Sequence, residues 1–192
     1  MNSDFFDLIR SYQEPVLIVR GVCEIGRFHP DSDGLLQGGC LHRLYAPISK
    51  KIIARMEKRV GKAFPDSVRE IYMNSNGLTL FCESIYVRGS LECDGVQPIS
   101  IDYGNLIDLP VDDNGLEIYS KEYLYIGSYG YDGSSIKVNV KTGEVYREAR
   151  GRWGYILNSW SNVDFFLRSE FVRMDEWYKK TGGTICSSSD PI

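Results

Sequence analysis

The segment GKAFPDSVREIYMNSNG, residues 61–77, constrains the fold of this chain more than any other. Pro65 suits the first position of a helix, because the amide hydrogen that proline lacks would have no intrahelical partner there. Three apolar residues then recur at helical spacing and predict one buried stripe: Val68, Ile71 and Tyr72. Asn76 and Gly77 both tolerate a positive φ, so we expect them to end the helix and turn the chain towards residues 78–81.

A second helix is predicted just before this segment, over residues 49–60, with Ser49 as its N-cap and Gly61 beyond its end. Its apolar residues fall on one face: Ile52, Ile53, Met56 and Val60. Its opposite face is basic, with Lys50, Lys51, Arg55, Lys58 and Arg59. No aromatic residues interleave with these charges, so the pattern is typical of a solvated helix and we expect no nucleic-acid binding.

The first 46 residues predict an N-terminal extension made of a helix, two short strands and a loop, packed on the main domain. Residues 4–12 have helical spacing, with one face formed by Phe5, Leu8, Ile9 and Tyr12. Residues 16–20 and 22–28 are predicted to be strands. Residues 29–40 are dense in turn-forming residues, which predicts an exposed loop.

After residue 77 the pattern changes to short strands and turns. Strands are predicted over residues 78–81, 84–88, 123–127, 134–140 and 144–147. In residues 134–140, apolar and polar residues alternate, which predicts a half-buried strand with its polar side chains in solvent. The apolar set is Ile136, Val138 and Val140, and the polar set is Lys137 and Asn139. Residues 141–143, KTG, suit a three-residue hairpin loop.

A closing helix is predicted near the C-terminus. Ser161 and Asp164 have the spacing of a capping box, and the pair Gly182-Gly183 predicts the end of the helix. The apolar stripe between them comprises Val163, Phe166, Leu167, Phe171, Met174 and Tyr178. Residues 182–192 are small and polar and predict a flexible tail. The order of elements predicts a single α+β domain, with a mainly antiparallel twisted meander sheet flanked by helices on one side and a closing C-terminal helix.

The composition is typical of a folded cytoplasmic protein. A chain of 192 residues, 43% of them hydrophobic, can bury a proper core. Its longest apolar runs are far too short to span a bilayer, so we expect no membrane partner. Its five cysteines are scattered and odd in number, which indicates a reducing compartment.

The net charge of −4 arises in the second half of the chain. Residues 102–122 hold six acidic side chains against one lysine, and four of the six are Asp108, Asp112, Asp113 and Glu117. Such a stretch repels nucleic acid and attracts a basic protein partner. The alternative is a solvated acidic loop without a partner.

Aromatic residues suggest a second part of a binding surface. Tyr129, Tyr131 and Asp132 fall in one predicted turn, and Trp153 and Tyr155 follow on a nearby strand. Exposed tyrosine and tryptophan side chains often anchor protein interfaces. The alternative is that these rings pack in the core beneath the sheet. Under the first interpretation, the Tyr129–Asp132 turn and the four acidic residues form the partner-binding set.

Little in the sequence indicates catalysis. It has two histidines, and it contains neither a Gly-x-Ser-x-Gly elbow nor a phosphate-binding Gly-x-x-x-x-Gly-Lys motif. Cys23, His29, Cys40 and His42 are ligand types that suit zinc, but their spacing matches no familiar zinc module. The alternative is a buried Cys23, a loop Cys40 and two surface histidines. We therefore expect no enzymatic activity, no metal and no cofactor.

The order of segments and motifs resembles the SUKH superfamily over residues 47–181. The first motifs are a helix ending in Gly61, then Phe64-Pro65, then the pair Asn76-Gly77; the family more often has leucine where Phe64 stands. Next comes YLYIGSYGYDGSSIKVNVKTGEVY, residues 123–146. The last are Trp160, Phe166-Leu167 and Arg173.

The resemblance implies a non-enzymatic protein-binding domain. The superfamily includes a fungal cell-wall-synthesis regulator and many bacterial immunity proteins. It implies first an immunity protein that neutralises a cognate polymorphic or contact-dependent bacterial toxin, such as a nuclease, by direct binding. The alternative is an intracellular regulatory or scaffold protein of the cell-wall-synthesis-regulator type. Neither the toxin nor the oligomeric state follows from the sequence.

Overall fold

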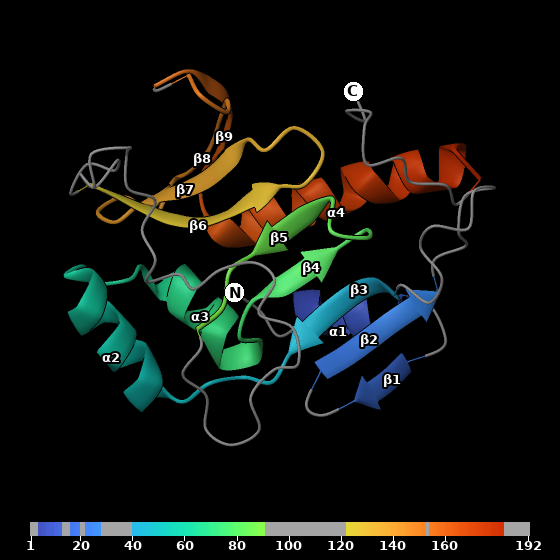
Figure 1. Cartoon of the computed structure of the whole chain (residues 1–192), viewed down its shortest axis with the longest axis horizontal. Helices are drawn as coiled ribbons and strands as arrows, with labels where there is room; N and C mark the ends of the chain where they lie inside the picture. The colour runs from blue at the N-terminus through green and yellow to red at the C-terminus, as the bar shows by residue number, and fades with distance from the viewer. Residues whose placement is uncertain are drawn as a thin grey trace.

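The computed structural model describes residues 4–12, 16–19, 22–27, 40–90, 122–152 and 154–182. Within these ranges nine strands form one open antiparallel meander, in which each strand pairs with the next along the chain (Figure 1). The strands are β1 (Val16–Val19), β2 (Val22–Arg27), β3 (Cys40–Tyr45), β4 (Leu78–Leu80), β5 (Ile85–Val87), β6 (Tyr123–Tyr129), β7 (Ser135–Asn139), β8 (Val145–Glu148) and β9 (Ile156–Trp160). The helices are α1 (Asp4–Arg10), α2 (Lys50–Val60), α3 (Asp66–Asn74) and α4 (Val163–Lys180). The α+β class, the meander and the closing helix are confirmed.

The helices bury their apolar faces in one core with the sheet. Figure 1 shows α1 and α4 behind the strands, and the rings of Phe5 in α1 and Phe171 in α4 meet edge to face, with centroids 6.0 Å apart. Helices α2 and α3 lie together at the lower left of the same view. A single cluster of buried side chains includes residues from all four helices and from strands β2 to β9.

The N-terminal residues belong to this core and to this sheet. The predicted helix over residues 4–12 is confirmed as α1, which ends at Arg10, but its predicted face is partly wrong, because Phe6 is buried and Leu8 is exposed. Both predicted strands are confirmed as β1 and β2. Strand β3 was not predicted, since its sequence CLHRLY does not alternate cleanly between apolar and polar residues. Of the predicted loop over residues 29–40, residues 29–39 lie outside the described residues, and the prediction is wrong for Cys40, which begins β3.

Helix α2 has the predicted bounds and caps. The Ser49 hydroxyl accepts a hydrogen bond from the Ile52 amide, and Gly61 ends the helix with a φ of 68°. All four predicted apolar residues of α2 are buried, and its five basic residues are exposed. In α3 the predicted stripe is buried, but Pro65 is the N-cap and the first helical residue is Asp66.

The Asn-Gly pair after α3 acts differently from the prediction. Helix α3 ends before Ser75, and only Gly77 takes a positive φ, of 85°. Asn76 is buried, and its side chain binds the backbone of Ser90 twice, donating to the carbonyl at 2.8 Å and accepting from the amide at 2.7 Å. Asn76 therefore joins the end of α3 to the residues that follow β5.

The C-terminal helix begins one residue later than the capping-box spacing predicts. Asn162, rather than Ser161, is the N-cap of α4, and its side-chain oxygen accepts from the Phe165 amide at 2.8 Å. All six residues of the predicted stripe are buried, so the face of α4 is confirmed. A cap is a local choice among neighbouring polar residues, whereas the stripe is fixed by burial along the whole helix.

The turn between β4 and β5 has an unusual backbone. Phe81, Cys82 and Glu83 have φ values of 48°, 53° and 71°, in the left-handed region that costs a residue other than glycine about 1–2 kcal/mol. The Phe81 ring is fully buried against Phe171, with centroids 5.3 Å apart, and this packing offsets the strain. The strained turn also supports its neighbour, because the Ser84 carbonyl accepts from the Gly130 amide at 3.0 Å.

Candidate functional site

Three turns lie side by side at one end of the sheet. The β4–β5 turn binds the β6–β7 turn through the hydrogen bond from Gly130 to Ser84. The β6–β7 turn also contacts the β8–β9 turn. The Arg150 side chain lies so close to Gly133 that a Cβ atom added there would be 2.8 Å from Cδ of Arg150. The middle turn carries Tyr131 and Asp132, two of the residues predicted to bind a partner.

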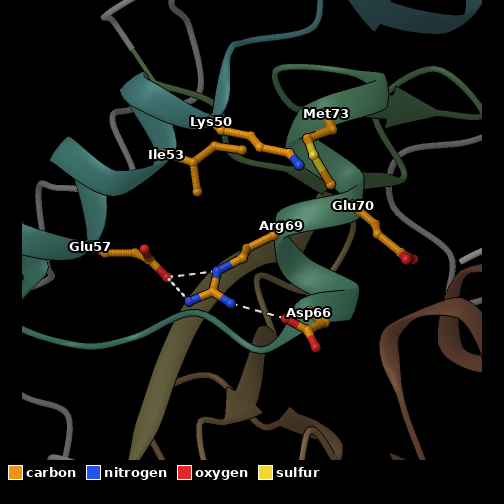
Figure 2. Close-up of a pocket in the computed structure, with 7 residues that line it drawn as sticks. All are labelled: Lys50, Ile53, Glu57, Asp66, Arg69, Glu70 and Met73. Atoms are coloured by element: carbon orange, nitrogen blue, oxygen red, sulfur yellow. Dashed lines mark hydrogen bonds and ion pairs between the residues drawn. The ribbon is translucent and has the colours of Figure 1, made fainter.

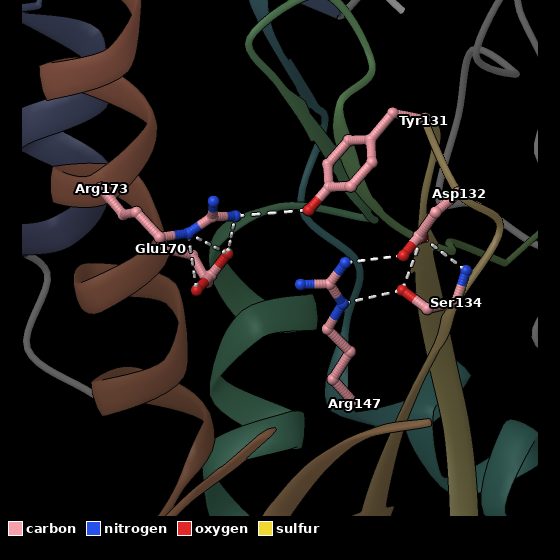
Figure 3. A network of polar contacts seen from close by, with 6 residues as sticks. All are labelled: Tyr131, Asp132, Ser134, Arg147, Glu170 and Arg173. Carbon is pink, nitrogen blue, oxygen red and sulfur yellow. Dashed lines mark hydrogen bonds and ion pairs between the residues drawn. The ribbon is translucent and has the colours of Figure 1, made fainter. Parts of the chain in front are cut away.

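Asp132 fixes the shape of this turn (Figure 3). Its Oδ1 accepts hydrogen bonds from the amide and the hydroxyl of Ser134, at 2.8 and 2.7 Å, and its Oδ2 accepts from Arg147 at 2.7 Å. Burial opposes ionisation of the Asp132 carboxyl, but these hydrogen bonds and the Arg147 charge outweigh it and lower its pKa. Asp132 is therefore a carboxylate that holds the turn rigid.

Tyr131 lies between two arginines. Arg173 of α4 donates to the Tyr131 hydroxyl at 3.4 Å, and the Arg147 guanidinium carbon lies 5.4 Å from the centre of the Tyr131 ring. Arg173 is itself held by Glu170, which accepts from its Nε and its terminal nitrogen at 3.2 and 2.7 Å. The Tyr131 residue is half-buried and so keeps some exposed surface beside the turn.

Tyr129 belongs to the core, so the prediction that it binds a partner is wrong. Its side chain is 1% exposed, its ring meets that of Tyr131 edge to face at 5.6 Å, and the Arg147 guanidinium carbon lies 4.1 Å above its ring centre. Burial, and then the nearby Glu170 carboxylate, raise the pKa of the Tyr129 hydroxyl. Tyr129 is the last residue of β6, whose final residues are all buried.

The charged residues that support the turn were not predicted from the sequence. Arg147 pairs in register with the buried Ile136 and therefore lies on the inner face of β8. Arg173 carried part of the family resemblance, but no role was assigned to it. Glu170 is only 4% exposed and lies on the apolar face of α4, four residues after Phe166 and four before Met174, but a charged residue gives no local sign that it is buried. Their cooperation depends on the contacts that β8 and α4 each make with the β6–β7 turn, which local sequence patterns do not contain.

Several predicted site residues lie outside the described residues: Asp108, Asp112, Asp113, Glu117 and Trp153. Their role in partner binding stays a prediction. Tyr155 is described, and its side chain is exposed just before β9. It is not part of the Tyr131 cluster, which comprises Tyr131, Asp132, Ser134, Arg147, Glu170 and Arg173.

The polar atoms of the cluster satisfy one another. The Ser134 hydroxyl donates to Asp132 and accepts from Nε of Arg147 at 2.8 Å, so it is engaged on both sides. A serine nucleophile needs a neighbouring base, and the cluster offers this hydroxyl a carboxylate that is already bonded to an arginine. The arrangement stabilises a turn and presents a tyrosine, which suits recognition.

Three of the four cysteine and histidine residues considered as zinc ligands are described, and they lie on the paired strands β2 and β3. His42 is fully buried, so the expectation of two surface histidines is wrong for it. Its Nδ1 accepts from the Phe81 amide at 3.3 Å, and its ring packs on Phe81 and Tyr12. Cys40 opens β3 and Cys23 lies in β2; both thiols are half-buried, and burial raises the pKa of each. His29 lies outside the described residues. No group of three or more acidic, histidine or cysteine side chains within the described ranges is placed to hold a metal ion.

His42 is expected to make the fold sensitive to acid. Burial lowers its pKa from 6.5 to about 3, against a smaller opposing effect of Asp175. Below pH 6.5 the unfolded chain therefore binds a proton that the folded chain does not, and stability falls by about 1.4 kcal/mol per pH unit. Urea titrations should give a loss of about 2 kcal/mol between pH 7.5 and 5.

The variant His42→Asn should remove most of this slope, while His29→Asn, which removes the other imidazole, should keep it. Asparagine retains an acceptor for the Phe81 amide. A slope that disappears with His29→Asn and persists with His42→Asn would contradict the assignment.

A pocket of about 450 Å³ opens between α2 and α3 (Figure 2). Its lining residues are Lys50, Ile53, Glu57, Asp66, Arg69, Glu70 and Met73. Glu57 accepts from Arg69 at 2.7 and 2.9 Å and from the Phe64 amide at 2.7 Å, and Asp66 accepts from Arg69 at 2.9 Å. These bonds join α2 to α3, so we interpret the charges at the lower end of the pocket as a structural clamp.

A protein family matches a large part of the chain. The family described as the SMI1 / KNR4 family (SUKH-1) matches residues 47–169, well over half of the chain. The curated proteins contain no match to this sequence. Among the described helices, none combines the length and the apolar character needed to cross a membrane. On the strength of the match over residues 47–169, the chain belongs to the SMI1/KNR4 family (SUKH-1).

Proposed function

We propose that this protein acts by binding another protein, as an immunity protein that neutralises a cognate bacterial toxin. The family includes toxin immunity proteins and is generally non-catalytic. The observation that carries the proposal is the rigid Tyr131–Asp132 turn, in which a half-buried tyrosine is held by two arginines. Binding a toxin at this end of the sheet would block its active site without any chemistry by the immunity protein.

The construction of the turn favours tight binding. Ordering a mobile loop on association costs roughly 0.5–1.5 kcal/mol for each flexible side chain. Asp132 and Arg147 are already fixed by each other and by Ser134, so this cost is largely avoided on complex formation. Tyrosine supplies a large contact area with only two rotatable bonds, and such residues dominate many interfaces.

The remaining predictions complete the proposal. Residues 47–181 form the binding domain, residues 1–46 form an extension whose strands β1, β2 and β3 continue its sheet, and residues 182–192 form a tail. The acidic stretch 102–122 steers the protein towards a basic face of the toxin, such as the nucleic-acid groove of a nuclease. The protein works in the cytoplasm, as a single folded unit that needs no cofactor.

Co-expression with the toxin encoded beside this gene tests the proposal. Cells that produce the toxin domain alone should stop growing, and this chain should restore their growth and co-purify with the toxin. No rescue and no complex would remove the immunity function. A housekeeping gene neighbourhood without a toxin gene would favour the regulatory role of the cell-wall-synthesis-regulator type instead.

Replacing Tyr131 by alanine tests the site itself. We expect the affinity for the toxin to fall by about 2 kcal/mol, or roughly 30-fold, because an interface anchor is removed. Tyr146→Ala is the matched control, since Tyr146 is a half-buried tyrosine near the hairpin loop at the other end of β8. Biolayer interferometry with the purified toxin domain measures both. Equal affinities for the two variants would move the binding site elsewhere on the protein.

A further inference from the structure

The β8–β9 hairpin carries exposed side chains that the Tyr131 cluster does not use. It projects at the top of the molecule in Figure 1. Arg150 and Arg152 lie in its turn and are exposed, and the three apolar residues Tyr155, Ile156 and Leu157 that follow are exposed as well. Consecutive exposed apolar residues beside two positive charges indicate a contact surface.

Strand β9 is also an edge of the sheet. Within the described part of the chain it pairs with β8 and with no other strand. The amide of Ser159 donates to the side-chain oxygen of Asn158, its own neighbour, at 2.8 Å. A backbone carbonyl of an incoming strand can replace this local acceptor. Edge strands of this kind serve as templates for strand addition.

We propose that the edge of β9 opposite β8 binds an extended segment of the protein partner by strand addition, with a carboxylate of that segment placed against Arg150 and Arg152. Apolar side chains of the segment would lie on Ile156 and Leu157. The arginines make the turn end of the hairpin positive, so the acidic residue of the segment lies at that end and fixes the direction of the added strand. The inference rests on the proposed function, because its occupant is the same partner.

Two further contacts support a surface that is ready for binding. The Arg152 guanidinium carbon lies 5.8 Å from the centre of the Tyr155 ring, which keeps this charge at the start of β9. Arg150 packs against Gly133, so the β8–β9 hairpin lies directly beside the Tyr131–Asp132 turn. One partner can therefore cover both turns, with its added strand along β9.

The test uses the full chain and the purified toxin domain encoded beside its gene. The double variant Arg150→Glu/Arg152→Glu should weaken binding at least about tenfold, because it repels the carboxylate. Lys51→Glu/Lys58→Glu makes the same change in net charge on the exposed face of α2 and should stay within about twofold of the unmodified protein.

A second pair of variants tests the apolar contact. Leu157→Ser should weaken binding about tenfold, whereas Val172→Ser on the solvent face of α4 should leave it unchanged. The two side chains are comparably exposed, at 44% and 53%, so neither substitution should harm the fold. Hydrogen exchange of the complex should show new protection of the amides of residues 155–159.

The outcomes separate the two proposals. A complex whose affinity is unaffected by all the hairpin variants, without new protection in β9, would overturn strand addition and leave the immunity function standing. Absence of any complex with the unmodified chain would overturn both. Loss of binding by the hairpin variants, with the two controls intact and β9 protected, is the expected result.

Discussion

Replacing Gly127 by alanine is expected to lower the free energy of unfolding by about 3 kcal/mol or more, one of the largest effects of a single methyl group in this protein. Gly127 lies in β6 at a register shift and pairs with Val87 of β5. A Cβ atom at this position would lie 2.0 Å from the carbonyl oxygen of Tyr86, which is backbone and cannot rotate away. Strands β5 and β6 would have to separate, in the middle of the meander.

Thermal and urea unfolding measure this effect. For a chain of this size, 3 kcal/mol corresponds to a fall in Tm of roughly 6–12 °C. Gly143→Ala is the matched control: nothing lies within 4 Å of its added Cβ, but its φ of 78° costs about 1 kcal/mol. Similar losses for the two variants would show that the close approach of β5 to β6 is relieved without cost.

Replacing Lys137 by methionine is expected to cost about 3–5 kcal/mol, because it leaves the Glu148 carboxylate buried without its counter-charge. The Lys137 and Glu148 side chains form an ion pair and are only 9% and 3% exposed. The Lys137 ammonium also lies 4.8 Å from the centre of the Tyr123 ring, and Glu148 accepts from the Gly154 amide. The pair therefore links β7, β8 and the start of the β8–β9 turn.

A double-mutant cycle isolates the interaction. Lys137→Met/Glu148→Gln should recover at least about 1 kcal/mol relative to the sum of the single variants, since no buried charge remains. Lys141→Met is the control, because Lys141 pairs with Glu122 at 3.6 Å with side chains 76% and 57% exposed, and it should change stability by less than about 0.5 kcal/mol. Additive losses in the cycle would mean that the two side chains stabilise the fold independently.

These predictions also mark where sequence patterns fail. Alternation in residues 134–140 correctly predicted β7 and its buried Ile136 and Val138, but it predicted a solvated Lys137. The outer face of β7 is not solvent there, because the side chains of neighbouring strands cover it. Tyr129 was misplaced for a similar reason. A turn-flanking tyrosine has no local signal that distinguishes an exposed ring from one packed under Arg147.

By itself, the sequence determined the class of the fold, most of the helices and strands, and the family. These rest on hydrophobic periodicity and on glycines with positive φ at turns and helix ends, such as Gly61, Gly77 and Gly143. Both signals act over a few residues, so they can be recognised in the sequence alone. Only the tertiary structure decided that β3 extends the sheet, that His42 and Lys137 are buried, and that Arg147 and Arg173 hold Tyr131. Each of these depends on contacts between segments far apart in the chain. When a distant segment buries a residue, the neighbouring residues in the sequence do not reveal it.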